Sequence, residues 1–128
     1  MIVADANILA YLYLPGESTS QAEALLQDDP EWAAPVLWRS EFRNTLTGYV
    51  RRGDLTLDQV CEIQGMAESF MGGREYDVNS TQVLTLSRSH GCSAYDCEYV
   101  ALAITLGARL VTCDKQVLRA FPGVAVAL

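Results

Sequence analysis

Short apolar segments alternate with helix-like segments along the chain, and this alternation restricts the fold more than any other feature. Five runs are typical of strands: residues 1–4, 32–34, 75–78, 109–112 and 124–128. Single or paired stretches with helical spacing separate them: residues 6–14, about 18–30, 36–52, 56–70, 79–91, 93–106 and 115–121. Strands and helices that alternate in this way favour a mainly parallel sheet covered by helices. We therefore expect an α/β fold that binds its ligand at the carboxyl ends of the strands.

Capping residues and glycines mark several of the expected helix boundaries. Ser20 with Glu23, and Thr56 with Gln59, have the spacing of a capping box at a helix start. Gly91 follows the end of another expected helix and favours a stop there. Residues 99–106 are almost wholly apolar, so the helix over 93–106 should be buried on most of its surface.

Length and charge narrow the class of protein. A chain of 128 residues predicts one domain, residues 1–128. Nine basic and 16 acidic residues give a formal net charge of −7, which argues against a broad basic face for nucleic acid and favours a basic partner or bound cations. The longest uncharged stretch, residues 6–16, is too short to span a membrane, and no cationic leader precedes it, so we expect a cytoplasmic protein.

The histidine and cysteine content excludes other chemistries. His90 is the only histidine, and the four cysteines form no CxxC pair, which leaves no zinc ligand set and no histidine-pair or triad mechanism. We expect the cysteines to be buried reduced thiols. His90 lies beside the helix-ending Gly91, where a structural role is favoured over a general-acid role.

Four acidic residues stand at positions where a fully solvated charge is not expected. Asp5 and Asp114 directly follow predicted strands, so both should project from the same edge of a parallel sheet. Asp96 lies in the first turn of the apolar helix, on a stripe that should face the interior. Glu41 borders the apolar stripe of its own helix. We therefore predict that the four acids lie close together in space although they are far apart in the sequence.

Each acid taken singly could be an ordinary helix cap or a surface residue. Four together point to a counter-charge, because two unit charges ~4 Å apart repel by ~4 kcal/mol at an effective dielectric of 20. Oxygen ligands without histidine favour Mg²⁺ or Mn²⁺, which can activate water and neutralise a phosphoryl group. The pattern therefore favours metal-assisted hydrolysis of a phosphodiester.

The ordered set of motifs resembles the PIN domains of VapC-type toxins over the whole chain. The motifs are Asp5 with Asn7, Glu41 at the end of residues 34–41, Asp96 within residues 94–103, and Thr112-Cys113-Asp114. The resemblance implies a three-layer α/β/α sandwich on a mainly parallel sheet of four or five strands. It implies that Asp5, Glu41, Asp96 and Asp114 hold Mg²⁺ or Mn²⁺ directly or through water, supported by Asn7 and Thr112. Ala6 departs from the Thr or Ser that is common at this position in the family.

The same resemblance implies an endoribonuclease that cleaves single-stranded RNA and acts as the toxin of a toxin–antitoxin pair. Arg39 and Arg43 are candidates for binding the RNA phosphates, with a solvated helix face as the alternative. We expect a homodimer, and an antitoxin that inserts a basic residue among the acids. Leu12, Leu14 and Leu25 could line a groove for a partner helix, or could belong to the core.

Two rival interpretations stay open at this point. The first is a catalytically silent PIN-like module that binds RNA or protein without cutting. The second is a response-regulator receiver, which needs a phosphorylatable aspartate at the end of a central strand. Asp54 instead lies between Gly53 and a predicted helix cap, which argues against a receiver.

Overall fold

The computed structural model describes all 128 residues as five strands and seven helices. The strands are β1 (Ile2–Ala4), β2 (Trp32–Pro35), β3 (Glu75–Tyr76), β4 (Arg109–Thr112) and β5 (Ala125–Ala127). The helices are α1 (Ala6–Tyr13), α2 (Thr19–Asp28), α3 (Trp38–Arg51), α4 (Leu57–Met71), α5 (Ser80–His90), α6 (Ala94–Leu106) and α7 (Lys115–Ala120). Every strand and helix expected from the sequence is present.

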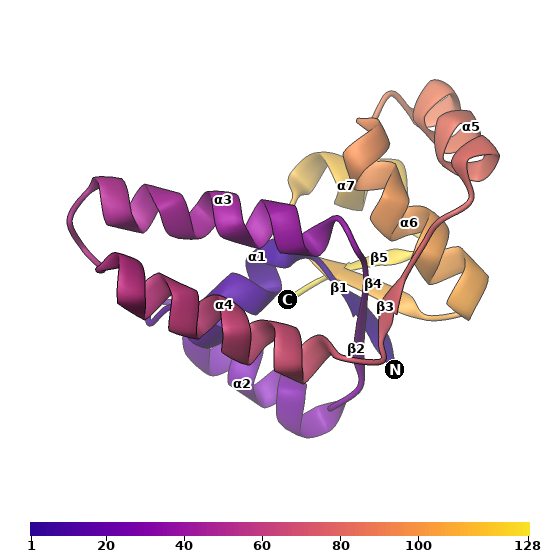
Figure 1. Cartoon of the computed structure of the whole chain (residues 1–128). Helices are drawn as coiled ribbons and strands as arrows, with labels where there is room; N and C mark the ends of the chain where they lie inside the picture. Colours follow the sequence, from indigo (N-terminus) through magenta and orange to yellow (C-terminus); the bar gives the residue numbers. More distant parts are fainter.

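The five strands form one parallel sheet in the order β3-β2-β1-β4-β5. The chain moves outward from β1 through β2 to β3, and then returns to the other side of β1 as β4 (Figure 1). The strand order therefore reverses between β1 and β4. Open α/β sheets bind ligands at such a reversal, outside the carboxyl ends of the strands.

Helices cover both faces of the sheet. Helix α6 packs across β1, β2 and β4 on one side, with α5 against it. Helices α1, α3 and α4 pack together on the other side, where α4 also contacts β2 (Figure 1). This arrangement confirms the expected three-layer α/β/α sandwich. None of the helices combines the length and the apolarity that a membrane crossing would need.

The core is continuous across the sheet. Strand β1 is fully buried, and Trp32, Trp38 and Phe42 are the largest side chains without solvent exposure. Helix α6 buries six of its residues, among them Val100 and Ala103, the two that share the stripe of Asp96. The predicted burial of this helix is thus confirmed, and it places the first turn of α6 against the middle of the sheet.

One of the two predicted capping boxes is wrong. Helix α2 begins at Thr19, so Ser20 lies inside its first turn and cannot be the capping residue. The Thr19 hydroxyl oxygen instead accepts a hydrogen bond from the Gly16 amide at 3.0 Å, which fixes the preceding turn. The box of Thr56 and Gln59 is confirmed, with both reciprocal bonds present.

Two element boundaries differ from those expected from the sequence. The Val36 amide donates to the Tyr76 carbonyl at 3.1 Å, so α3 starts at Trp38 and not at Val36. The strand expected over residues 75–78 is limited to Glu75 and Tyr76.

One expectation about buried residues needs correction, and burial bears on the alternatives left open for three leucines. Cys92 and Cys97 are buried, as expected, but Cys61 and Cys113 are exposed, and all four are free thiols. Leu14 is a core residue, while Leu12 and Leu25 are partly buried against the core. The core alternative therefore holds for Leu14, although its edge also lines two hollows beside α1.

Candidate active site

Asp5 stands at the strand reversal and does not act as an ordinary helix cap. It follows β1 in extended conformation and precedes α1, but its side chain makes no capping hydrogen bond to that helix. Its Oδ2 instead accepts a hydrogen bond from the Thr112 hydroxyl at 2.8 Å. The carboxylate of β1 is therefore tied to the end of β4, across the point where the strand order reverses.

Thr112 links two of the predicted acids. Its side chain, at the end of β4, is almost completely buried. While the hydroxyl donates to Asp5, its oxygen accepts a hydrogen bond from the Asp114 amide at 3.0 Å. The supporting role predicted for Thr112 in a metal site stays a prediction.

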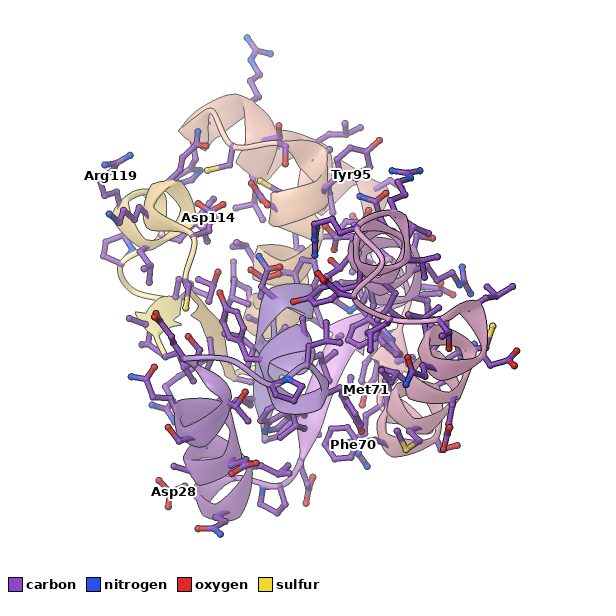
Figure 2. The ribbon with its side chains drawn as sticks, turned by 90° about the vertical axis from the view of Figure 1, so that its left-hand side faces the viewer. Asp28, Phe70, Met71, Tyr95, Asp114 and Arg119 are labelled. Carbon is purple, nitrogen blue, oxygen red and sulfur yellow. The ribbon has the colours of Figure 1, made fainter.

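Asp114 is a helix cap as well as a member of the acidic group. Its Oδ1 accepts from the Val117 amide at 3.0 Å and so caps α7. The Oδ2 atom makes no hydrogen bond within the protein. Figure 2 shows Asp114 at the start of α7 and Tyr95 at the start of α6 toward one end of the molecule, with Asp28 toward the other.

Asp96 and Glu41 face the same region from opposite layers of helices. The Ser93 hydroxyl oxygen caps α6 by accepting a hydrogen bond from the Asp96 backbone N–H at 3.1 Å. The Asp96 carboxylate therefore does not cap the helix. Glu41, in the first turn of α3, accepts a hydrogen bond on Oε1 from the Tyr99 hydroxyl at 2.6 Å. Arg39 and Arg43, its neighbours on α3, form ion pairs with Glu68 and Glu75 and none with Glu41.

Tyr99 is a site residue that the sequence reasoning missed. It is buried and lies three residues after Asp96 on the same face of α6. A buried tyrosine normally finds a hydrogen-bond partner for its hydroxyl, so a tyrosine in this apolar run was a usable signal. Its burial, its bond to Glu41 and the charge of Asp5 all raise its pKa and keep it protonated as a donor, although the Ala6 amide lowers it.

A small cavity joins the central members of the group. Asp5, Asp96, Tyr99 and Thr112 line it together with Leu110 and Val117, and its volume is about 10 Å³. A space of this size holds on the order of one water molecule. Asp5 and Asp96, which are 91 positions apart (96 − 5), therefore face one another across a shared space.

Burial and like charge act together on three of the acids. Burial is the main cause that raises the pKa of Asp5, Glu41 and Asp96. The charge of Asp96 adds to the effect at Asp5, and the charge of Asp114 adds to it at Asp96. The hydrogen bond from Thr112 lowers the pKa of Asp5, and that from Tyr99 lowers the pKa of Glu41.

The acidic group has no basic partner. The ion pairs of the protein join other residues, and none includes Asp5, Glu41, Asp96 or Asp114. An all-oxygen group with uncompensated charge suits a hard divalent cation such as Mg²⁺ or Mn²⁺. No three carboxylates converge as a ready-made ligand set, so an ion here would take part of its shell from water, which is usual for Mg²⁺.

The remaining predicted site residues lie outside this group. Arg39 donates to both carboxylate oxygens of Glu75, at 2.6 and 2.7 Å, and to Glu68 at 2.8 Å. Its guanidinium thus joins α3 to α4 and β3, which argues against the prediction that it binds RNA phosphates. Arg43 is exposed in the groove between α3 and α4, 4.0 Å from Glu68. Asn7 is exposed. Its backbone N–H and that of Ala6 both lower the pKa of Asp5.

His90 has the structural role that the sequence favoured. Its Nδ1 lies 3.1 Å from the Leu86 carbonyl oxygen, and its ring packs on Phe121 with centroids 4.3 Å apart. Asp54, the aspartate that a receiver would require, is exposed and pairs with Arg52. The structure therefore places neither residue in the acidic group.

Fold and site together define a class: a parallel α/β/α domain with a group of unpaired carboxylates at its strand reversal. The chain belongs to the PIN domain family, whose model matches residues 2–123. It is 32% identical over 124 residues to Ribonuclease VapC3 of Pyrobaculum aerophilum, a match that covers 94% of this chain and 95% of that protein.

Solved structures share the same fold at low sequence identity. The crystal structure of PAE2754 from Pyrobaculum aerophilum matches with a TM-score of 0.78 and 20% identity, over 98% of this chain and 89% of that one. A toxin–antitoxin complex from Klebsiella pneumoniae matches with a TM-score of 0.68 and 18% identity, over 98% and 96% of the two chains. The predicted PIN fold is thus confirmed.

Proposed function

We propose that this protein is an endoribonuclease of the VapC type that hydrolyses single-stranded RNA with Mg²⁺ or Mn²⁺. The observation that carries the proposal is the group of four acids without a basic partner, at the strand reversal of a PIN fold. The 32% identity to a relative named as a ribonuclease supports the same activity.

Asp5, Glu41, Asp96 and Asp114 would hold the cation, directly or through water. A divalent ion would lower the pKa of a water molecule and neutralise charge on the phosphate. Thr112 orients Asp5 by its hydrogen bond, and Tyr99 orients Glu41 in the same way. A water molecule would form the new bond to phosphorus and give up a proton. The bond to the 3′ oxygen would break and that oxygen would take up a proton, which would leave a 5′-phosphate and a 3′-hydroxyl.

The four acids would have different parts in holding the ion. Asp5 and Asp96 line the shared cavity, which supports a direct role for both. Asp114 has one oxygen committed to α7 and offers the other. Glu41 enters from α3, on the opposite side of the sheet from α6, and closes the group.

A single-turnover cleavage assay on total RNA tests this function. We expect cleavage with Mg²⁺ or Mn²⁺ and none with EDTA, and 5′-phosphate ends on the fragments. Asp96→Asn should abolish the activity, while Asp54→Asn, which also removes an aspartate charge but lies outside the group, should retain it. RNA binding without cleavage by the wild-type protein would overturn the proposal in favour of a catalytically silent module.

We further propose that the protein is the toxin of a toxin–antitoxin pair, located in the cytoplasm. A group of carboxylates without a basic partner would suit a guanidinium, which pairs with a carboxylate through two hydrogen bonds. A structural relative solved as a toxin–antitoxin complex supports a partner of this kind. Co-purification with the product of the adjacent gene, and inhibition by it, would test the pairing. A homodimer stays a prediction that light scattering can check.

A further inference from the structure

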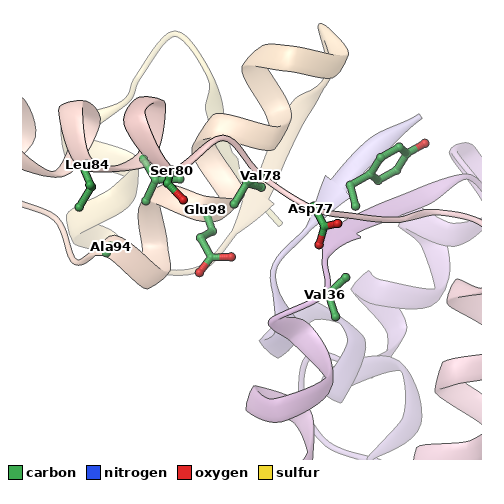
Figure 3. A pocket seen from close by; sticks show the side chains of 9 residues that line it. Val36, Asp77, Val78, Ser80, Leu84, Ala94 and Glu98 are labelled. Atoms are coloured by element: carbon green, nitrogen blue, oxygen red, sulfur yellow. The ribbon is translucent and has the colours of Figure 1, made fainter.

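A second hollow lies beside the acidic group at the same edge of the sheet. We call it the edge pocket; its main lining residues are Val36, Asp77, Val78, Ser80, Leu84 and Glu98 (Figure 3). Its volume is about 480 Å³. Sites for small ligands run from roughly 300 to 1,000 Å³, so the pocket has room for one.

The position of the edge pocket relates it to the cleavage site. Val36 directly follows β2 and Asp77 directly follows β3, as Asp5 follows β1. Neighbouring strands lie about 4.8 Å apart, so the pocket begins one strand away from Asp5. Glu98 follows Asp96 by two residues on α6, and its charge is near enough to Glu41 to help raise the pKa of that residue.

The lining combines apolar walls with carboxylate acceptors. Val36 and Leu84 are apolar side chains that remain 46% and 64% exposed. Figure 3 shows the Glu98 carboxylate projecting between Leu84 and Ala94 on one side and Val36 and Asp77 on the other. No lysine or arginine lines the pocket, and neither Asp77 nor Glu98 forms an ion pair. The pocket thus has room for an apolar body that carries hydrogen-bond donors along one edge.

We propose that the edge pocket binds a guanine base of the RNA next to the cleaved phosphodiester, with Glu98 accepting hydrogen bonds from guanine N1–H and N2–H. Among the four RNA bases, guanine alone has two adjacent donors on its pairing edge, which matches the two oxygens of a carboxylate. Unpaired bases of single-stranded RNA are commonly turned outward into such sites and hydrogen-bonded on that edge. The proposal rests on the ribonuclease function and specifies its substrate.

Nucleotides that cannot be cleaved test the pocket separately from catalysis. GMP and IMP differ only in the N2 amino group, and an NMR titration of the protein in Mg²⁺ buffer measures both affinities. We expect shifts at the amides of Leu84 and Glu98, and GMP bound about tenfold more tightly than IMP, as one base-specific contact predicts. Glu98→Gln should abolish this ratio. Glu62→Gln, the same change at an exposed site on α4, should preserve it.

A second variant keeps the proposal testable if Glu98→Gln does not fold. Leu84 is largely exposed, so Leu84→Ala should fold normally and weaken GMP and IMP binding equally through loss of an apolar wall. A GMP to IMP ratio near one in the wild-type protein, or an unchanged ratio in Glu98→Gln, would overturn the proposal. An arginine-containing peptide that displaces GMP and binds more tightly would overturn it in favour of a protein partner.

Cleavage of short RNAs with a single guanine or inosine separates the two proposals. Cleavage at equal rates on both RNAs would overturn the guanine site and leave the ribonuclease standing. A selective GMP site in a protein that cuts no RNA would overturn the ribonuclease and leave the guanine site standing. Faster cleavage beside guanine, with the preference lost in Glu98→Gln, supports both.

Discussion

Asp5 and Asp114 occupy the same local context, yet their side chains do different things. Each follows a strand and precedes a helix, but only Asp114 caps its helix. The carboxylate of Asp5 instead accepts a hydrogen bond from Thr112, which is 107 positions away in the sequence. A local pattern therefore predicts that both acids reach the sheet edge, but not which of them is a cap.

Replacing Asp5 by asparagine should stabilise the metal-free protein while it abolishes RNA cleavage. Asparagine can still accept the hydrogen bond from Thr112, and it removes a buried charge that faces Asp96. We expect the midpoint of thermal unfolding in EDTA to rise by about 2–5 °C, and activity to fall by at least about 100-fold. Thermal melts and the cleavage assay measure the two effects. A lower melting temperature with normal activity would refute this role for Asp5.

Tyr99→Phe should lower both stability and activity through Glu41. The change removes the hydroxyl that donates to Glu41 at 2.6 Å, and a hydrogen bond to a charged group contributes about 1.5–3 kcal/mol. Because Glu41 is only partly buried, water should replace part of the lost hydrogen bond. We therefore expect the free energy of unfolding, measured in urea, to fall by about 1.5 kcal/mol. Tyr95→Phe, at an exposed tyrosine on the same helix, should change neither quantity.

At the level of secondary structure, local signals were enough where the sequence supplies its own partner. The capping box of Thr56 and Gln59 and the helix end at Gly91 involve only residues within one or two turns. Ser20 failed as a cap because the turn before α2 is organised by Thr19 and Gly16. The contact of Glu41 with Tyr99 joins residues 58 positions apart, and no periodicity encodes it.

The bond network of Arg39 makes a prediction about how α3, α4 and β3 are held together. Arg39→Met should lower the melting temperature by several degrees, because it leaves the half-buried Glu75 carboxylate without its main partner. It should leave RNA affinity unchanged, since the guanidinium is already engaged by two carboxylates. Arg43→Met is the matched comparison, and should weaken RNA binding if Arg43 contacts phosphate. Weaker RNA binding by the Arg39 variant at unchanged stability would restore Arg39 as a phosphate ligand.

Across the whole molecule, two sets of acids act on stability with opposite sign. The pKa values of Asp5, Glu41 and Asp96 are raised in the folded protein, mainly by burial. In the unfolded chain these groups ionise near pH 4, so a stability penalty develops as pH rises from there through the raised folded values. Glu75 has a lowered pKa because Arg39 binds it, and its contribution is lost as pH falls through the folded value.

We therefore expect the metal-free protein to gain stability as pH falls from 7 toward the unfolded pKa values near 4, and to lose stability below about 4. Urea unfolding at a series of pH values in EDTA checks the trend. Saturating Mg²⁺ at pH 7 should remove most of the gain, because the ion supplies the missing counter-charge. A free energy of unfolding that falls steadily from pH 7 downward would contradict the stability penalty assigned to Asp5, Glu41 and Asp96.

The central claim is that four separate acids form one cation site, and Mn²⁺ binding measured without RNA tests it most directly. Isothermal titration calorimetry, or a titration followed by electron paramagnetic resonance, should show saturable binding of Mn²⁺ to the wild-type protein. Asp5→Asn and Asp96→Asn should each weaken it at least about tenfold, because both residues line the shared cavity. Asp54→Asn, at an exposed aspartate paired with Arg52, should bind as the wild type does. Equal Mn²⁺ affinity in all four proteins would contradict the account, because the cation would then bind elsewhere.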